Sequence, residues 1–324
     1  MSNGIVLVTG ATGAVGPTLV NHLLHQGYEV RSYGLDEPAP GLFAEQIEHI
    51  TGDINDETRL ARGLNGIDIV FHLAALLHIE NPAPELAPEY WHVNVNGSRL
   101  AAEQAVLANV RRFVYFSTVK VYGISQREPV TEDAPTSPES TYAQTKWAGE
   151  EAVRTIEGLE TCVLRLSAVF GPRLKGSWNR LVRTIARGYF VPIGNLQNAH
   201  SLTYVDDVAQ AALIAAEASD AAGQVYNVVG YENPRLQDIL ESIYSALSHT
   251  APSYRIPSGI ALLGSFVLEQ GFKLLGKQAP LTSNAVHQLT DDEVYSGAKL
   301  RQLGFAPSLT LEQSWQRTID QRQK

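Results

Sequence analysis

The chain has 324 residues, a formal net charge of −9 and one cysteine, Cys162. This length can bury a large core and predicts one large or two modest domains. The negative charge argues against a nucleic-acid-binding surface, and a single cysteine excludes an intrachain disulfide. Because the first strand is predicted near residue 4, we expect no signal peptide. No uncharged run is long enough to span a bilayer, so we expect a cytoplasmic protein without an integral membrane segment.

Short apolar runs alternate with helical patterns over the first 170 residues. The predicted strands are 4–8, 29–33, 47–50, 68–73, 112–117 and 161–167. The predicted helices between them include 14–26, 56–64, 91–109 and 141–157. This alternation predicts βαβ units and an α/β fold with a doubly wound parallel sheet. Later apolar runs at 202–205 and 225–229, with helices near 206–218 and 235–248, predict a smaller lobe.

A glycine-rich turn joins the first predicted strand to the first predicted helix. It reads Thr9-Gly-Ala-Thr-Gly-Ala-Val-Gly16, with the spacing Gly-x-x-Gly-x-x-Gly. Glycines here permit a tight turn and let a pyrophosphate approach the N–H groups of a helix N-terminus. The alternative is a turn needed only for packing. With the sheet pattern, the turn predicts a dinucleotide-binding Rossmann domain over 1–170 and a mainly substrate-binding lobe over 171–324. We expect some of the later chain to return to the first domain.

Polar and small residues follow several other predicted strands. Gly52-Asp53-Ile54 follows the third, where a carboxylate and an apolar side chain can hold an adenine; Asp53 can equally cap a helix. His72 to Ala75 ends the fourth strand, and the hydroxyls of Ser117 and Thr118 end the fifth. Ligands of doubly wound sheets bind at the carboxyl ends of strands, so these residues are site candidates.

Tyr142 and Lys146 lie four residues apart in the predicted helix 141–157, and therefore on one face. A neighbouring cation favours the phenolate and lowers its pKa from about 10. Such a tyrosine can pass a proton to or from a substrate hydroxyl. The alternative is a chance spacing, in which the lysine stem packs on the ring.

The order of these motifs resembles the extended short-chain dehydrogenase/reductases of the NAD-dependent epimerase/dehydratase superfamily. Matching motifs also include Asn94-Val-Asn-Gly-Ser98, Arg165…Gly171-Pro172, Tyr204-Val-Asp-Asp-Val-Ala209 and Leu303-Gly-Phe305, so the resemblance covers nearly the whole chain. It implies an enzyme that transfers a hydride at a secondary hydroxyl or ketone carbon, and a homodimer without a metal.

The resemblance assigns catalytic roles to three residues. Thr118 would orient the substrate oxygen, Tyr142 would be the acid/base, and Lys146 would bind the nicotinamide ribose and depress the pKa of the tyrosine. The residues expected at the cofactor are Gly10, Thr12, Gly13, Ala14, Val15, Gly16, Asp36, Asp53, Ile54, Leu73, Ala74, Ala75, Asn94, Ser117, Tyr142, Lys146, Leu166, Ala168 and Val169. Asn94 can equally be a structural amide.

The cofactor expected is NAD, with NADP as the alternative. In relatives that prefer NAD, an acidic residue at the end of the second strand binds the ribose 2′-hydroxyl. Gly34 occupies that position here, Asp36 follows two residues later, and no arginine lies within 32–40, although Arg31 is close.

Departures from the family pattern limit the reaction. Relatives that dehydrate nucleotide sugars have an Asp-Glu pair after the catalytic threonine, whereas this chain has Val119 and Lys120, so dehydration is not expected. Ala168 and His200 replace an asparagine and an arginine common in nucleotide-sugar enzymes, which weakens the case for a nucleoside diphosphate. A basic stretch nearby keeps that ligand open, with a solvated helix face as the alternative: Arg173, Lys175, Arg180 and Arg183.

Other parts of the sequence resemble two different subgroups of this superfamily. Residues 117–122 and 171–178 are similar to sugar-nucleotide 4-epimerases and 4-reductases, while the C-terminal third is similar to 3β-hydroxysteroid dehydrogenases. The substrate is therefore a sugar nucleotide or a hydrophobic secondary alcohol. A non-enzymatic NAD(P)-binding regulator is a further alternative, although such proteins commonly lose the tyrosine or lysine.

The segment 257–277 has a helical pattern of its own. Ile260, Leu263, Val267 and Leu274 can share an apolar face, with Glu269 and Lys273 paired on the other. It can be a substrate lid, a membrane-surface helix or an ordinary packed helix.

Overall fold

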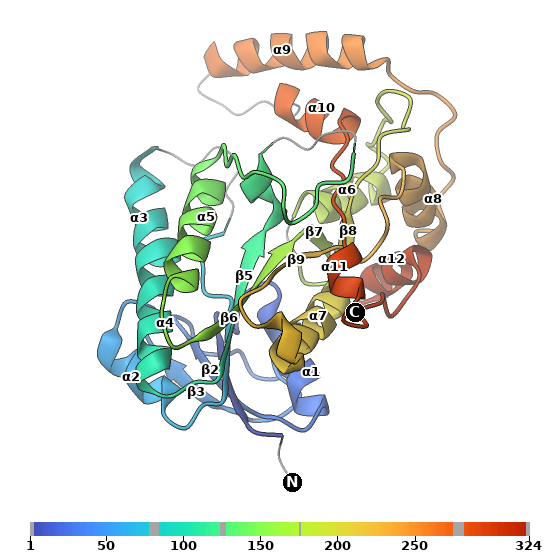
Figure 1. Cartoon of the computed structure of the whole chain (residues 1–324). Coiled ribbons are helices and arrows are strands. Elements are labelled where there is room, and N and C mark those ends of the chain that lie inside the picture. The colour runs from blue at the N-terminus through green and yellow to red at the C-terminus, as the bar shows by residue number, and fades with distance from the viewer. Residues whose placement is uncertain (1–2, 78–83, 124–127, 175, 275–281, 322–324) are drawn as a thin grey trace.

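The computed structural model describes residues 3–77, 84–123, 128–174, 176–274 and 282–321. Its main sheet has seven parallel strands in the order β3-β2-β1-β4-β5-β6-β9 (Figure 1). They are β1 (Ile5–Thr9), β2 (Glu29–Gly34), β3 (Glu48–Thr51), β4 (Ile69–His72), β5 (Arg112–Thr118), β6 (Glu160–Leu166) and β9 (Val225–Val228). The strand order reverses between β1 and β4, which is the switch point where such sheets bind ligands.

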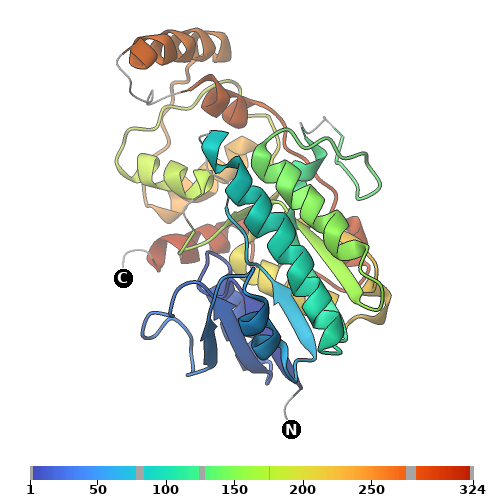
Figure 2. The same cartoon turned by 90° about the vertical axis from the view of Figure 1, so that its left-hand side faces the viewer.

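Helices cover both faces of this sheet. One face carries α2 (Glu57–Leu64), α4 (Ser98–Leu107) and α5 (Thr141–Arg154), and Figure 2 shows α4 and α5 side by side. The other face carries α1 (Gly16–His25) and α7 (Val205–Glu217), which contact each other. Buried apolar side chains fill both interfaces, as the continuous apolar strands require. The predicted doubly wound α/β fold is confirmed, and Cys162 lies buried within β6.

The predicted helix 91–109 contains an irregular turn. The chain passes from α3 (Ala87–Trp91) through a π-helical turn (His92–Gly97) into α4. A π-turn inserts an extra residue into the helix and is common near functional sites. Asn94 is fully buried within this turn.

The rest of the chain forms a lobe beside the carboxyl end of the sheet. Its regular elements are β7 (Ala168–Phe170), α6 (Ser177–Ala186), β8 (Leu202–Tyr204), α8 (Leu236–Ala246), α9 (Ser258–Leu274), α10 (Ser283–Thr290) and α12 (Leu311–Asp320), whereas α11 (Ala298–Arg301) packs against β9 of the main sheet. Short 3₁₀ turns occur at Pro84–Leu86, Val119–Tyr122 and Ser219–Ala221. β7 pairs with β8, and a core that includes Phe170, Trp178 and Trp315 holds the lobe together. Within the described ranges, no helix is long and apolar enough to cross a membrane.

Candidate active site

The glycine-rich turn packs closely against the ends of β2 and β4. Gly10 has a φ of +67°, and its N–H donates to the Tyr33 carbonyl at 2.8 Å. A Cβ on Gly10 would lie 2.8 Å from the backbone nitrogen of Ala74, and one on Gly16 would lie 2.3 Å from the Ala11 carbonyl oxygen. These positions therefore accept no larger residue.

The start of α1 is suited to an anion. Its first residues are Gly16 and Pro17, and no side chain caps the helix. The first N–H groups of a helix have no partner within it, and together with the helix dipole they bind phosphate groups. The turn residues Thr12, Ala14 and Val15 are half-buried and Gly13 is exposed. The chain thus fits the pyrophosphate of a dinucleotide at this edge.

The ends of β2 and β3 carry three acidic residues. Asp36 and Asp53 are exposed, at the same sheet edge as the glycine-rich turn. Sequence reasoning missed Glu37, whose carboxylate accepts a hydrogen bond from Thr51 at the end of β3. Its position beside Asp36 is the signal that could have found it.

The helix cap predicted at Asp53 is wrong. Asp56 caps α2 by accepting from the Arg59 N–H at 3.0 Å, whereas Asp53 accepts from the Asn55 N–H at 2.8 Å in a local turn. The Asp53 carbonyl also accepts from the Tyr33 hydroxyl at 2.7 Å. The Asp53 carboxylate is therefore held at the sheet edge instead of at the helix.

Ile54, also predicted at the cofactor, is buried against the π-helical turn. A Cβ on Gly97 would lie 2.4 Å from Cγ2 of Ile54. This side chain therefore fixes the π-turn beside β3, and only a small part of it can meet a ligand.

Asn94 ties the chain after β4 to helix α5. Its Oδ1 accepts from the Leu76 N–H at 2.7 Å, and its Nδ2 donates to the Leu76 carbonyl at 3.2 Å and to Thr145 Oγ1 at 3.1 Å. Leu73, Ala74 and Leu76 are half-buried, as is Ala75. These contacts favour the structural interpretation of the asparagine.

A buried polar chain supports the end of β4. The His72 ring is hydrogen-bonded to Thr9 Oγ1 at 3.1 Å and to Ser98 Oγ at 3.0 Å. Burial, with the charge of Lys146 adding to it, lowers the pKa of His72 to about 3. His72 is therefore a neutral structural group that fixes β1 against β4.

The three proposed catalytic residues come from neighbouring elements. Thr118 ends β5 and accepts from the Lys120 N–H at 3.2 Å, which begins the 3₁₀ turn. Ser140 caps α5 by accepting from the Ala143 N–H at 3.2 Å, so Tyr142 lies in the first turn of α5 and Lys146 in the next. Helix α5 contacts both β5 and the 3₁₀ turn, so the elements that carry these residues adjoin one another.

Lys146 is almost fully buried. Its Nζ lies 4.2 Å from the centroid of the Tyr115 ring, and among the described residues no acceptor takes a hydrogen bond from it. Burial lowers the pKa of Lys146 to about 7, although the nearby Glu150 carboxylate opposes that change. A buried ammonium with unused donors fits a hydroxyl-bearing ligand such as a ribose.

The expected lowering of the Tyr142 pKa is not seen in this structure. Burial raises the pKa of Tyr142 to about 12, and Tyr90 adds to the increase. The physical reason is desolvation, which disfavours the phenolate. A lysine with a pKa of about 7 is only partly charged near neutrality, so it contributes little to offset this.

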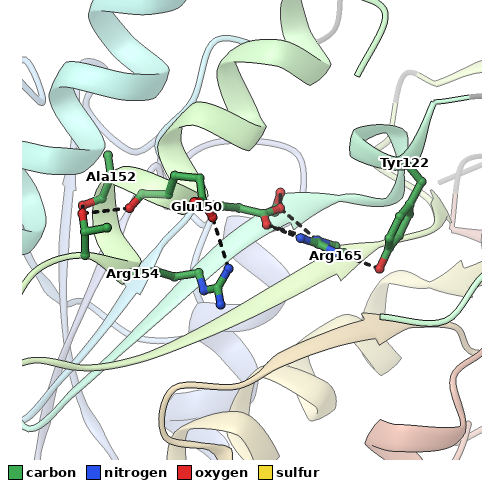
Figure 3. Close-up of polar contacts among 8 residues, drawn as sticks. Tyr122, Glu150, Ala152, Arg154 and Arg165 are labelled. Carbon is green, nitrogen blue, oxygen red and sulfur yellow. Dashed lines mark hydrogen bonds and ion pairs between the residues drawn. The ribbon is translucent and has the colours of Figure 1, made fainter. Parts of the chain in front are cut away.

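An ion-pair network lies one turn beyond Lys146 (Figure 3). Glu150 is fully buried and its Oε2 accepts from the Nη2 of Arg165 at 2.7 Å. Arg165 also donates to the Tyr122 hydroxyl at 2.9 Å, and that hydroxyl donates to Asn227 Oδ1 at 2.8 Å. Ser117, predicted at the cofactor, donates its hydroxyl to Glu150. The network fastens α5 to β5, β6 and β9.

The chain after β6 borders the same edge. Leu166 ends β6, and Ala168 and Val169 lie in β7, which pairs with β8; all three residues are half-buried. His200 is buried, and its Nε2 lies 2.7 Å from Nδ2 of Asn198. Burial lowers the pKa of the histidine. It is therefore unsuited to hold a diphosphate.

The basic residues within 173–183 do not form a single surface patch. Arg173 lines a small cavity of about 50 Å³ together with Ala14 and Thr18, at the start of α1. This places an arginine near the glycine-rich turn, which the sequence did not reveal. Arg180 and Arg183 lie on the exposed side of α6, and Lys175 lies outside the described residues.

Comparison with known proteins agrees with this geometry. The NAD dependent epimerase/dehydratase family model matches residues 6–229. The chain is 27% identical to N-acetyl-alpha-D-glucosaminyl-diphospho-ditrans,octacis-undecaprenol 4-epimerase of Escherichia coli O157:H7, over 98% of this chain and 95% of that protein. It is 30% identical to a 3 beta-hydroxysteroid dehydrogenase/Delta 5-->4-isomerase of Mycobacterium tuberculosis, over 96% of this chain and 88% of that protein.

A solved structure extends the match to the whole fold. MoeE5 in complex with UDP-glucuronic acid and NAD superposes with a TM-score of 0.76 and 25% identity, over 99% of each chain. The predicted enzyme class and the predicted cofactor, NAD, are confirmed by the family match. The chain therefore belongs to the NAD-dependent epimerase/dehydratase family, among the extended short-chain dehydrogenase/reductases.

Proposed function

We propose that the protein moves a hydride between NAD and a secondary hydroxyl or ketone carbon, with Tyr142 as the acid/base. The observation that carries this proposal is the buried Lys146 ammonium, one helical turn from Tyr142 and over the ring of Tyr115 in β5. Bound NAD supplies the hydride chemistry, whereas the protein supplies orientation and proton transfer. Thr118 would orient the reacting oxygen through its hydroxyl, whose oxygen accepts only the Lys120 N–H among the described contacts.

Different residues would bind different parts of the dinucleotide. The glycine-rich turn and Arg173 would hold the pyrophosphate, and Asp36 would accept the ribose 2′-hydroxyl, which favours NAD over NADP. Lys146 would donate to the nicotinamide ribose. A hydroxyl partner at Nζ favours the charged lysine, and a charged lysine in turn lowers the pKa of Tyr142 toward a useful range.

Elimination of water is not part of the proposal. Val119 is buried in an apolar cluster with Val121 and Tyr122, and the Lys120 ammonium donates to Glu293 at 2.6 Å. Neither residue can serve as the acid or base that elimination needs. The remaining reactions are oxidation, reduction and epimerisation at one carbon.

We propose a sugar carried on a diphosphate as the substrate, with inversion of its 4-hydroxyl. The support is the similarity to the 4-epimerase that acts on an undecaprenol-diphosphate-linked sugar and to MoeE5. The exposed arginines of α6, Arg180 and Arg183, also favour a diphosphate. The second candidate is a 3β-hydroxysteroid-like alcohol, supported by 30% identity to the mycobacterial dehydrogenase and by the unsuitability of His200 for a diphosphate.

One assay separates these candidates. The protein is incubated with NAD and, separately, with UDP-glucose, an undecaprenyl-diphosphate-linked N-acetylglucosamine and a 3β-hydroxysteroid. An epimerase converts the sugar, as seen by NMR, without net accumulation of NADH, whereas a dehydrogenase accumulates NADH in proportion to ketone. Absence of hydride transfer to or from any of these substrates would argue against the proposed reaction.

We also propose that the chain divides near residue 170 into a dinucleotide-binding part and a mainly substrate-binding part, that it forms a homodimer and that it is cytoplasmic. The division is supported by the cofactor candidates, which lie almost entirely before that residue, although β9 joins the main sheet. Sedimentation equilibrium tests the dimer directly.

A further inference from the structure

Helix α9 has one packed face and one exposed apolar face. Ala261 and Ser265 are buried on the side toward α10, where Ala261 joins a small core with Val286 and Ile193. On the opposite side, Ile260 is 65% exposed and Leu263 is 67% exposed. Both views place α9 at the outer edge of the molecule, above α10 (Figures 1 and 2).

We define the α9 outer face by its exposed apolar side chains: Ile260, Leu263, Phe266, Val267 and Leu268. Single exposed apolar residues are ordinary, but a group of five along one helix marks an interaction surface. The predicted pairing of Glu269 with Lys273 is wrong, because Glu269 accepts from the N–H and hydroxyl of Ser283 at 3.2 and 2.8 Å. This contact turns the carboxylate toward α10.

One cationic side chain lies near each end of the α9 outer face. Residues 256–268 contain no charged side chain. Arg255 precedes the helix, Lys273 lies near its end, and both are exposed. Tyr254, just before the helix, is 63% exposed, and tyrosines favour the boundary between headgroups and water. The helix therefore presents apolar side chains between two cations, with its carboxylate turned away.

We propose that the α9 outer face docks on the surface of an anionic phospholipid bilayer. The helix would lie in the plane of the membrane, with its apolar side chains at the headgroup boundary and its flanking cations on lipid phosphates. A second copy of the chain is the other candidate occupant, and the test below distinguishes it from a bilayer. The proposal is independent of the substrate and of the hydride-transfer chemistry.

Sedimentation with vesicles tests this docking. The full-length protein is mixed with vesicles of phosphatidylcholine alone or of an equimolar mixture with phosphatidylglycerol. We expect binding to the anionic vesicles, weakened by high salt, and a partition coefficient about tenfold or more lower for Leu263→Glu. Leu107→Glu is the matched control, because Leu107 is 74% exposed at the end of α4 and gains the same charge. It should bind as the unmodified protein does.

A second variant separates lost apolar contact from added charge. Leu263→Gln removes the apolar side chain without adding a carboxylate, and it should also bind more weakly. Thermal unfolding verifies that each variant is folded. Absence of sedimentation with anionic vesicles would overturn the proposal, as would equal binding by Leu263→Glu and Leu107→Glu. Self-association that Leu263→Glu abolishes, without vesicle binding, would instead assign the face to a second copy.

Discussion

The ammonium of Lys146 lies 4.2 Å from the centroid of the Tyr115 ring, and both side chains are buried. The face of an aromatic ring attracts a cation, and Glu150 adds a negative charge nearby. These contacts do not fully replace lost water, so burial still lowers the pKa of Lys146 to about 7. The site therefore holds a lysine that changes charge near neutral pH.

The free energy of unfolding should therefore depend on pH through Lys146. Between about pH 7 and the ordinary lysine pKa of 10.5, the unfolded chain binds more protons at this lysine than the folded chain does. The stability due to Lys146 therefore rises with pH across this window and is lowest below it. Relative to Lys146→Met, the unmodified protein should gain up to about 1.4 kcal/mol of unfolding free energy per pH unit. Urea unfolding at several pH values measures this, and a constant difference between the two proteins would contradict the proposed burial.

Breaking the ion pair of Glu150 with Arg165 should destabilise the fold. Glu150→Gln leaves the Arg165 guanidinium buried without its carboxylate, which should cost about 3–5 kcal/mol of unfolding free energy. Glu151→Gln is the matched control, because the Glu151–Arg154 pair is largely exposed and should be worth about 1 kcal/mol or less. Urea unfolding compares the two, and equal losses would show that the buried network does not hold α5 in place.

The glycine-rich turn offers a test of close packing. Gly10 and Gly27 both have positive φ, at +67° and +83°, but a Cβ on Gly27 would meet nothing within 4 Å. Gly27→Ala should therefore cost about 1–2 kcal/mol from backbone strain alone. Gly10→Ala should cost about 1–3 kcal/mol more because its methyl group collides with Ala74, and it should also weaken NADH binding. Unfolding curves and NADH fluorescence titrations measure both effects; equal behaviour of the two variants would refute the packing argument.

Much of the sheet follows from local sequence. The predicted strand 112–117 corresponds to β5 (Arg112–Thr118), and the predicted strand 161–167 to β6 (Glu160–Leu166), because continuous apolar runs favour buried parallel strands. The Ser140 cap and the spacing of Tyr142 and Lys146 likewise follow from short-range rules.

Features that depend on distant contacts did not follow from the sequence. Glu150 meets Arg165 and Ser117 only after three elements have packed, and Arg173 reaches the glycine-rich turn only through the lobe. The pKa of Tyr142 depends on desolvation, which a helical spacing does not report. The sequence also did not determine which face of α9 packs against the protein, because both sides of this helix carry apolar residues.

Tyr142→Phe tests the central claim most directly, because it removes the phenolic hydroxyl and leaves the ring. Hydride transfer is measured in single turnover with NAD and whichever substrate the assay above identifies, and NADH binding is measured by fluorescence. Tyr189→Phe, which changes a tyrosine that is 77% exposed, is the control and should keep full activity. We predict that Tyr142→Phe lowers the rate about 100-fold or more while NADH binding stays within about twofold. A near-normal rate in Tyr142→Phe would contradict the assignment of this tyrosine as the acid/base.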